Sequence, residues 1–158
     1  MRHFFVGIFV LMLTSCEYFN VKKTSSEAIL NEELQAFNWN DVDEYPSFSE
    51  CDSLSVKEDR KGCFQSVLTL HIWEFLKNER LVVSQDINDT LLLKFQATKE
   101  GDIYMLEAEM DSITSQEIPN IKSLLKKSLD SLPEIFPAIK RGQQVTTEFN
   151  LPIIINVN

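Results

Sequence analysis

Residues 144–157 read QVTTEFNLPIIINV, and apolar and polar side chains alternate along this stretch almost without interruption. A period of two is typical of a β-strand that has one buried and one wet face. Pro152 cannot donate a hydrogen bond to a neighbouring strand, so it places the strand at a sheet edge or at a bulge. An edge strand with a buried face can accept another strand, so we expect a docking edge here.

Two earlier segments, residues 91–98 and 103–110, show the same alternation. The residues between them include Gly101, which can adopt the positive φ that a tight turn needs. The pattern therefore predicts a β-hairpin with one buried and one wet face.

Two segments have the spacing of amphipathic helices, residues 64–78 and residues 118–132. Pro119 suits the first turn of the second helix, and Pro133 ends it. The order helix, hairpin, helix, strand predicts an α+β domain in which two helices pack on a three-stranded antiparallel sheet.

The start of the chain has the pattern of a lipoprotein signal peptide. Arg2 precedes an apolar run over residues 4–13, which is too short to span a bilayer. Leu13, Thr14, Ser15 and Cys16 follow as a lipobox, in which small residues admit the signal peptidase and the thiol takes the lipid. We expect a signal peptide over residues 1–15 and lipidation at Cys16. The alternative is an ordinary signal peptide followed by a chance cysteine.

The two remaining cysteines, Cys51 and Cys63, form a natural pair in a chain that leaves the reducing cytoplasm. A disulfide between them would stabilise the fold by roughly 3 kcal/mol. The alternatives are free thiols or a metal site with His71 and a carboxylate, although zinc sites usually have a closely spaced ligand pair. His71 lies on the apolar face of the first helix, which favours a packed, hydrogen-bonded role, and we expect no metal.

The composition argues against nucleic acid and against catalysis. The formal net charge is −9, so no basic face for phosphate binding is expected. The chain has two histidines and four glycines, without a nucleophile elbow or a phosphate-binding loop. Glu107 and Glu109 could act as paired carboxylates, but an exposed strand face of an acidic protein also explains them. We therefore predict no enzyme and no cofactor.

Three parts are expected along the chain. Residues 1–15 form the signal peptide, residues 16–44 a tether with a short helix around 26–37, and residues 45–158 the folded domain. The helix follows from a capping-box pattern, Thr24 to Glu27, which precedes spaced apolar residues.

The end of the chain resembles the closing motif of TonB C-terminal domains of Bacteroidetes, and residues 45–64 resemble the opening segment common in those proteins. The closing motif comprises Leu132, Pro133, Pro137, Lys140, Arg141, Gly142, Val145, Phe149, Leu151, Pro152 and Ile153. The opening segment comprises Tyr45, Pro46, Phe48, Cys51, Asp52, Arg60, Cys63 and Phe64.

The resemblance implies the same α+β fold and a domain that adds an extended peptide to an exposed sheet edge. TonB itself has an uncleaved membrane helix and a proline-rich spacer, whereas this chain has a lipoprotein signal and no proline over residues 17–45. The binding module is therefore expected without energy transduction. The expected docking edge comprises Gln144, Val145, Thr146, Thr147, Glu148, Phe149, Asn150, Leu151, Pro152, Ile153, Ile154 and Ile155.

The sequence thus predicts a lipid-anchored protein of the bacterial cell envelope, with its domain in the periplasm and its anchor in the outer rather than the inner membrane. The expected partner is an envelope protein or extended peptide bound by strand addition, in association with envelope transport. The alternative is a structural lipoprotein that uses the sheet edge to form a homodimer.

Overall fold

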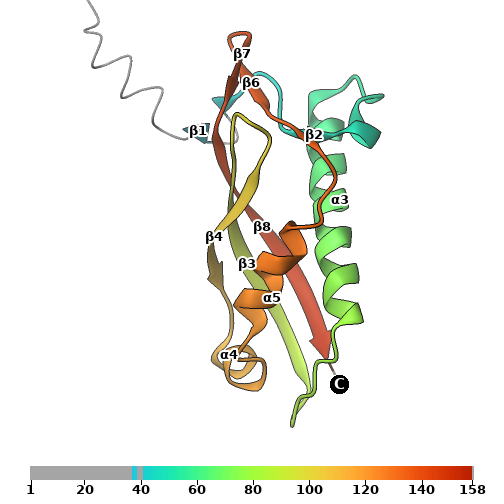
Figure 1. The fold of residues 1–158 in the computed structure, drawn as a ribbon, viewed down its shortest axis with the longest axis vertical. Coiled ribbons are helices and arrows are strands. Elements are labelled where there is room, and N and C mark those ends of the chain that lie inside the picture. The colour runs from blue at the N-terminus through green and yellow to red at the C-terminus, as the bar shows by residue number, and fades with distance from the viewer. Residues whose placement is uncertain (1–36, 39–40, 158) are drawn as a thin grey trace, which may run out of the picture. The chain divides into compact units, whose positions relative to one another are not determined.

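The computed structural model describes residues 37–38 and 41–157 (Figure 1). These residues belong to a compact unit that spans Gln35–Asn158. The predicted signal peptide over residues 1–15 and the lipidation residue Cys16 lie outside the described residues. So does the predicted helix over residues 26–37, except for Phe37.

The fold is α+β, with a sheet in the strand order β1-β8-β3-β4. Its central strand is β3 (Ile87–Ala97), which pairs antiparallel with β8 (Thr147–Val157) on one side and with β4 (Ile103–Glu109) on the other. The predicted three-stranded antiparallel sheet is therefore present. A further strand, β1 (Phe37–Asn38), adds to β8 in parallel.

The alternation of strand side chains is confirmed. On β3, Leu91, Leu93 and Phe95 are fully buried, and on β8 the odd-numbered residues from Thr147 to Ile155 are buried. The even-numbered residues of β8 from Asn150 to Asn156 are exposed. The sheet therefore has one face in the core and one open face within the described residues.

Three α-helices are described rather than two. Helix α3 (Lys57–Asn78) begins earlier than predicted and buries Phe64, Leu68, Ile72 and Leu76 at four-residue spacing. The predicted helix over residues 118–132 is present as α5 (Ile121–Leu129), which is shorter at both ends, and a helix that was not predicted, α4 (Ser112–Glu117), precedes it.

Pro119 lies between these two helices, so its predicted place in a first helical turn is wrong. The residue before a proline is pushed out of the helical region. Ile118 accordingly has φ −125° and ψ 72° and ends α4. Helices α3 and α5 contact each other, and their buried side chains join those of the strands in one core.

Short elements connect the larger ones. β2 (Ser47–Phe48) pairs with β5 (Ile135–Phe136), and a 3₁₀ turn η2 (Ser49–Cys51) follows β2. β6 (Ala138–Lys140) and β7 (Gln143–Val145) form a separate hairpin. The predicted single strand over residues 144–157 is therefore divided at Thr146, whose Oγ1 accepts a hydrogen bond from the backbone N–H of Lys99 at 3.3 Å.

The packed unit begins before Tyr45, the first residue of the predicted domain. Val42 is only 2% exposed. The backbone N–H groups of Asp43 and Glu44 donate to the carbonyl of Ile139 at 2.8 and 3.0 Å. Part of the predicted tether is therefore built into the fold.

Candidate docking edge

Pro152 of β8 lies directly opposite Leu92 of β3 in a ladder that runs without a break from Ile87 to Ala97. Opposed residues in an antiparallel ladder alternate between pairs that exchange hydrogen bonds and pairs that do not. Proline has no N–H, so Leu92 and Pro152 must form a pair of the second kind. The neighbouring pairs, Leu91 with Ile153 and Leu93 with Leu151, then hold the two strands together.

This assignment fixes the direction of every backbone group along β8. Odd-numbered residues direct their N–H and carbonyl groups towards β3. Even-numbered residues direct theirs to the opposite, outer side of β8. The outward row comprises Asn150, Pro152, Ile154 and Asn156, and we call it the β8 edge row.

The β8 edge row offers main-chain carbonyls at all four positions and N–H donors at three of them, because Pro152 supplies none. The side chains of the same four residues lie on the open face of the sheet and are exposed. Ile154 is 63% exposed and lies next to the exposed Pro152 in this row. Among the residues that the structure describes, the row therefore combines backbone groups without a strand partner with a small apolar centre.

Strand β1 covers the beginning of the same edge. Phe37 lies beside Thr147 and Asn38 beside Glu148, and among the described residues no other strand follows on that side of β8. Counting only the described residues, the part of the edge without a neighbouring strand therefore begins after Glu148.

The structure divides the predicted docking residues into different environments. Gln144 and Val145 belong to β7 and pair with Ile139 and Ala138 of β6. Thr147 and Glu148 lie beside β1, and the odd-numbered residues bond towards β3. Within the predicted range, the outward row therefore consists of Asn150, Pro152 and Ile154. Asn156 belongs to it as well, although the predicted edge ended at Ile155.

On the open face, Lys94 of β3 lies between acidic residues of the two neighbouring strands. Its Nζ lies 2.8 Å from Oε2 of Glu148, and it also lies opposite Glu107 of β4. The hydrogen bond and the charge of Glu148 raise the pKa of Lys94 above its ordinary value. The ion pair thus bridges β3 and β8 at the end of the β8 edge row.

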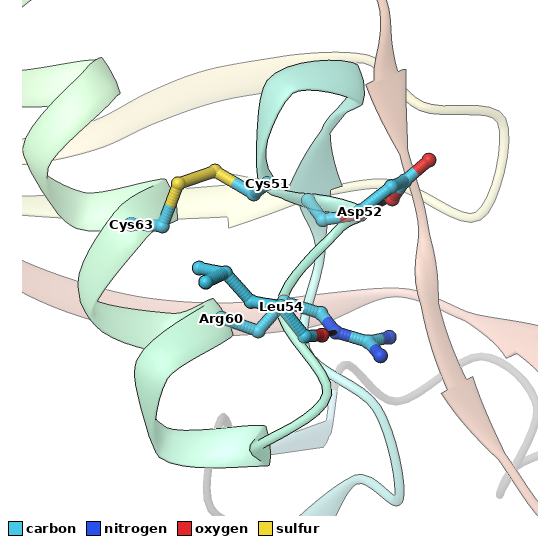
Figure 2. Close-up of a disulfide and its surroundings, with 6 residues drawn as sticks. Cys51, Asp52, Leu54, Arg60 and Cys63 are labelled. Atoms are coloured by element: carbon cyan, nitrogen blue, oxygen red, sulfur yellow. Dashed lines mark hydrogen bonds between the residues drawn. A yellow bond between two sulfur atoms is a disulfide. The ribbon is translucent and has the colours of Figure 1, made fainter.

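Cys51 and Cys63 form a disulfide between η2 and α3, with a Cα–Cα distance of 5.9 Å (Figure 2). Cys51 is fully buried. Close to the bridge, the Nε of Arg60 donates to the carbonyl of Leu54 at 3.1 Å (Figure 2). The disulfide therefore joins the opening segment to the helix, as the pairing of the two cysteines in the sequence suggested.

The closing-motif residues build the hairpin that precedes β8. Arg141 and Gly142 form its two-residue turn, and both have positive φ, 52° and 76°. The N–H of Arg141 donates to Oδ2 of Asp43 at 2.6 Å. Pro133 and Pro137 lie before and after β5. These residues shape the approach to β8 and do not line the β8 edge row.

His71 has a structural contact. Its Nε2 donates to the carbonyl of Ser128 at 2.9 Å and lies 3.1 Å from Oγ of Ser131, so it ties α3 to the end of α5. Glu107 and Glu109 lie exposed on β4, opposite Lys94 and Leu92. Within residues 37–38 and 41–157, no group of three or more histidine, cysteine or acidic residues could hold a metal ion.

In the part of the chain that the structure describes, no helix combines the length and the apolar character needed to cross a membrane. Comparison with known protein families, with characterised proteins and with solved structures finds no match to this chain.

Proposed function

We propose that this chain is a non-catalytic, lipid-anchored envelope protein whose TonB C-terminal-like domain binds an extended segment of another envelope protein. The segment adds to the sheet as a strand beside β8. The observation that carries the proposal is the β8 edge row, in which unused main-chain groups accompany an exposed isoleucine.

Strand addition suits this edge because main-chain pairing supplies affinity without requiring a particular sequence. Each hydrogen bond contributes roughly 1 kcal/mol net, so binding along the short row is modest and reversible. Side chains on the open face then add selectivity, and Ile154 favours an apolar neighbour on the incoming strand. The order of helix, hairpin, helix and final edge strand fits the TonB-like fold.

The anchor rests on the lipobox that ends at Cys16. Cells that express the full chain should incorporate labelled palmitate, and the Cys16→Ser variant should not. Equal labelling of the two proteins would contradict the lipoprotein assignment. The same signal supports export from the cytoplasm, and we propose the periplasmic side of the outer membrane as the site of the anchor. Association with envelope transport is part of the same proposal.

Binding is tested with the full chain as bait, carrying a photo-crosslinking residue in place of Asn156. The Asn150→Pro variant removes an outward N–H and changes the side chain. Asn150→Ala changes the side chain but keeps the N–H, so it is the matched control. We expect that an envelope protein is crosslinked equally by the bait with Asn150 and by the Asn150→Ala bait. The Asn150→Pro bait should not crosslink it.

The mass of the crosslinked peptide identifies the segment that lies beside β8. A partner whose crosslinking is the same for Asn150→Ala and Asn150→Pro does not use the outward N–H, which would contradict strand addition. Circular dichroism of each variant confirms that the bait remains folded.

A further inference from the structure

The β8 edge row is symmetric in its chemistry. Residues 150–156 read NLPIIIN, with an asparagine at each end and apolar residues between. Counted outward from Ile153, Pro152 corresponds to Ile154, and Asn150 corresponds to Asn156. A strand of this pattern presents the same sequence of polar and apolar side chains in both directions.

An antiparallel pair of identical strands requires this property, because a two-fold axis places each residue opposite its symmetry counterpart. With the axis at Ile153, Asn150 of one copy lies opposite Asn156 of the other, and Pro152 lies opposite Ile154. All four are outward-facing residues that would form hydrogen-bonded pairs. Amide side chains then meet amides, and apolar side chains meet apolar ones, on the open face.

We infer that a second copy of this chain docks on the β8 edge row, with the two β8 strands antiparallel about Ile153. The inference rests on the proposed use of this edge for strand addition and names an occupant for it. The main sheets of the two copies become one continuous sheet across the dimer.

Pro152 favours the register about Ile153 over the two adjacent registers, which have the axis at Pro152 or at Ile154. About Ile153, the two asparagine pairs exchange both hydrogen bonds, and each Pro152 still accepts from the N–H of Ile154, which gives roughly six bonds. An axis at Pro152 places two prolines opposite each other, where neither can donate, and sets Asn150 beside Ile154. An axis at Ile154 sets Asn156 beside Pro152. Both alternatives lose hydrogen bonds and polar matching.

Strand β1 sets the limit of this arrangement. It lies beside Thr147 and Glu148, outside the paired range of residues 150–156. A contact of this length lies at the small end of stable interfaces, so the dimer is weak in dilute solution. Confinement of both copies to one membrane would raise their effective concentration and favour pairing. The dimer and a captured envelope segment compete for the same edge.

Disulfide trapping tests the register. Two full-length, lipidated proteins are prepared, one with Asn150→Cys and one with Asn156→Cys, and both are placed in the same phospholipid vesicles. The proposed lipid on Cys16 keeps them confined to one membrane and leaves that residue without a free thiol. Hydrogen-bonded antiparallel pairs have Cα atoms about 5.5 Å apart, within the range of a disulfide. We expect a disulfide-linked dimer in the mixture that is several-fold more abundant than in either protein alone.

The control pairs the Asn156→Cys protein with an Asn88→Cys protein. Asn88 is exposed on the same open face but lies on β3, away from the outer edge. Crosslinking of this pair as strong as that of positions 150 and 156 would show random collision and overturn the inference. Preferential self-crosslinking of either single variant would also overturn it, because it indicates a different register.

The outcomes separate this inference from the proposed function. If the mixture gives no specific dimer, but Asn150→Pro loses a partner that Asn150→Ala retains, the dimer is wrong and strand addition to another protein stands. If the specific dimer forms and no such partner is found, self-association is the use of this edge. Failure of both assays would reject the β8 edge row as a binding surface.

Discussion

Pro152 and Leu92 face each other across two strands without exchanging a hydrogen bond, and the ladder on both sides of them continues. This one pair divides β8 into an inward row of residues that hold the sheet together and an outward row that does not. The division makes neighbouring positions respond differently to the same substitution.

Proline at position 150 should be tolerated by the fold, and proline at position 151 should not. Asn150→Pro removes an outward N–H, so we expect the free energy of unfolding to fall by about 1 kcal/mol or less. Leu151→Pro removes an inward N–H and a buried side chain, and we expect a loss of more than about 3 kcal/mol. Urea denaturation measures both.

Leu151→Ala serves as the control for the lost side chain at position 151. The proline variant should be clearly less stable than the alanine variant. If Asn150→Pro unfolds the domain while Leu151→Pro matches Leu151→Ala, the assignment of the two rows is reversed.

Gly101 and Gly62 should respond in opposite directions to alanine. Gly101 has φ 92°, and a Cβ built there would lie 2.4 Å from the carbonyl oxygen of Ile135. Gly101→Ala should therefore cost about 2 kcal/mol or more. Gly62 lies in α3 with no atom within 4 Å of an added Cβ, so Gly62→Ala should stabilise by up to about 1 kcal/mol. Thermal melts of the two variants provide the comparison, and a stable Gly101→Ala protein would refute the close approach.

The disulfide should contribute about 3 kcal/mol to the folded state, because it closes a short loop in the unfolded chain. Cys51 and Cys63 are 12 residues apart, and the bridge anchors η2 beside α3. The Cys51→Ser/Cys63→Ser variant should unfold at a lower urea concentration. The same unfolding curve is expected when the original protein is reduced, and a reduced protein with unchanged stability would contradict this role.

Glu117 should make the segment before β3 sensitive to acid. Its carboxylate accepts hydrogen bonds from the backbone N–H and the Oγ of Ser84, at 2.6 and 2.8 Å, and from Nε2 of Gln85 at 3.2 Å. These bonds, that of the Ser84 N–H first, lower the pKa of Glu117 below its ordinary value of 4.5.

A lowered pKa in the folded state means that the stabilisation is present above pH 4.5 and is lost as the pH falls through the folded-state pKa. Glu117→Gln should lack this contribution at every pH. The difference in stability between the two proteins should therefore be complete well above pH 4.5 and shrink as the pH falls below it. Hydrogen exchange of the Ser84 N–H should accelerate over the same interval, and a constant difference between the proteins would contradict the prediction.

The sequence allows the main sheet to be predicted because its strands alternate strongly. Leu91, Leu93 and Phe95 face the core as their spacing indicates, and Gly101 occupies a turn with positive φ. The edge position of β8 follows from a single residue, Pro152. These features depend on the local pattern of residues, which can be read directly from the sequence.

The missed features depend on tertiary neighbours. Strand β1 has two residues, too few to show a period, and it forms because β8 lies beside it. The β6–β7 turn contains Arg141 at φ 52°, where asparagine or aspartate would have given a recognisable signal. The second predicted helix began too early, at Ile118, because Ile118 fits the apolar spacing of Ile121, whereas Pro119 lies before the observed helix α5. Helix α4, with six residues, is too short to show a clear period and was not predicted.

The pairing of β3 with β8 also constrains when the domain can fold. Ile87 pairs with Val157 and Ala97 with Thr147. The central strand β3 therefore cannot form this half of the sheet until β8, which is synthesised much later, is available. Until the 11 residues of β8 are available, one side of β3 and much of the core have nothing to pack against. Such distant contacts slow folding, because a long loop must close before they form. A nascent chain of this kind therefore cannot complete its central sheet until β8 has been synthesised.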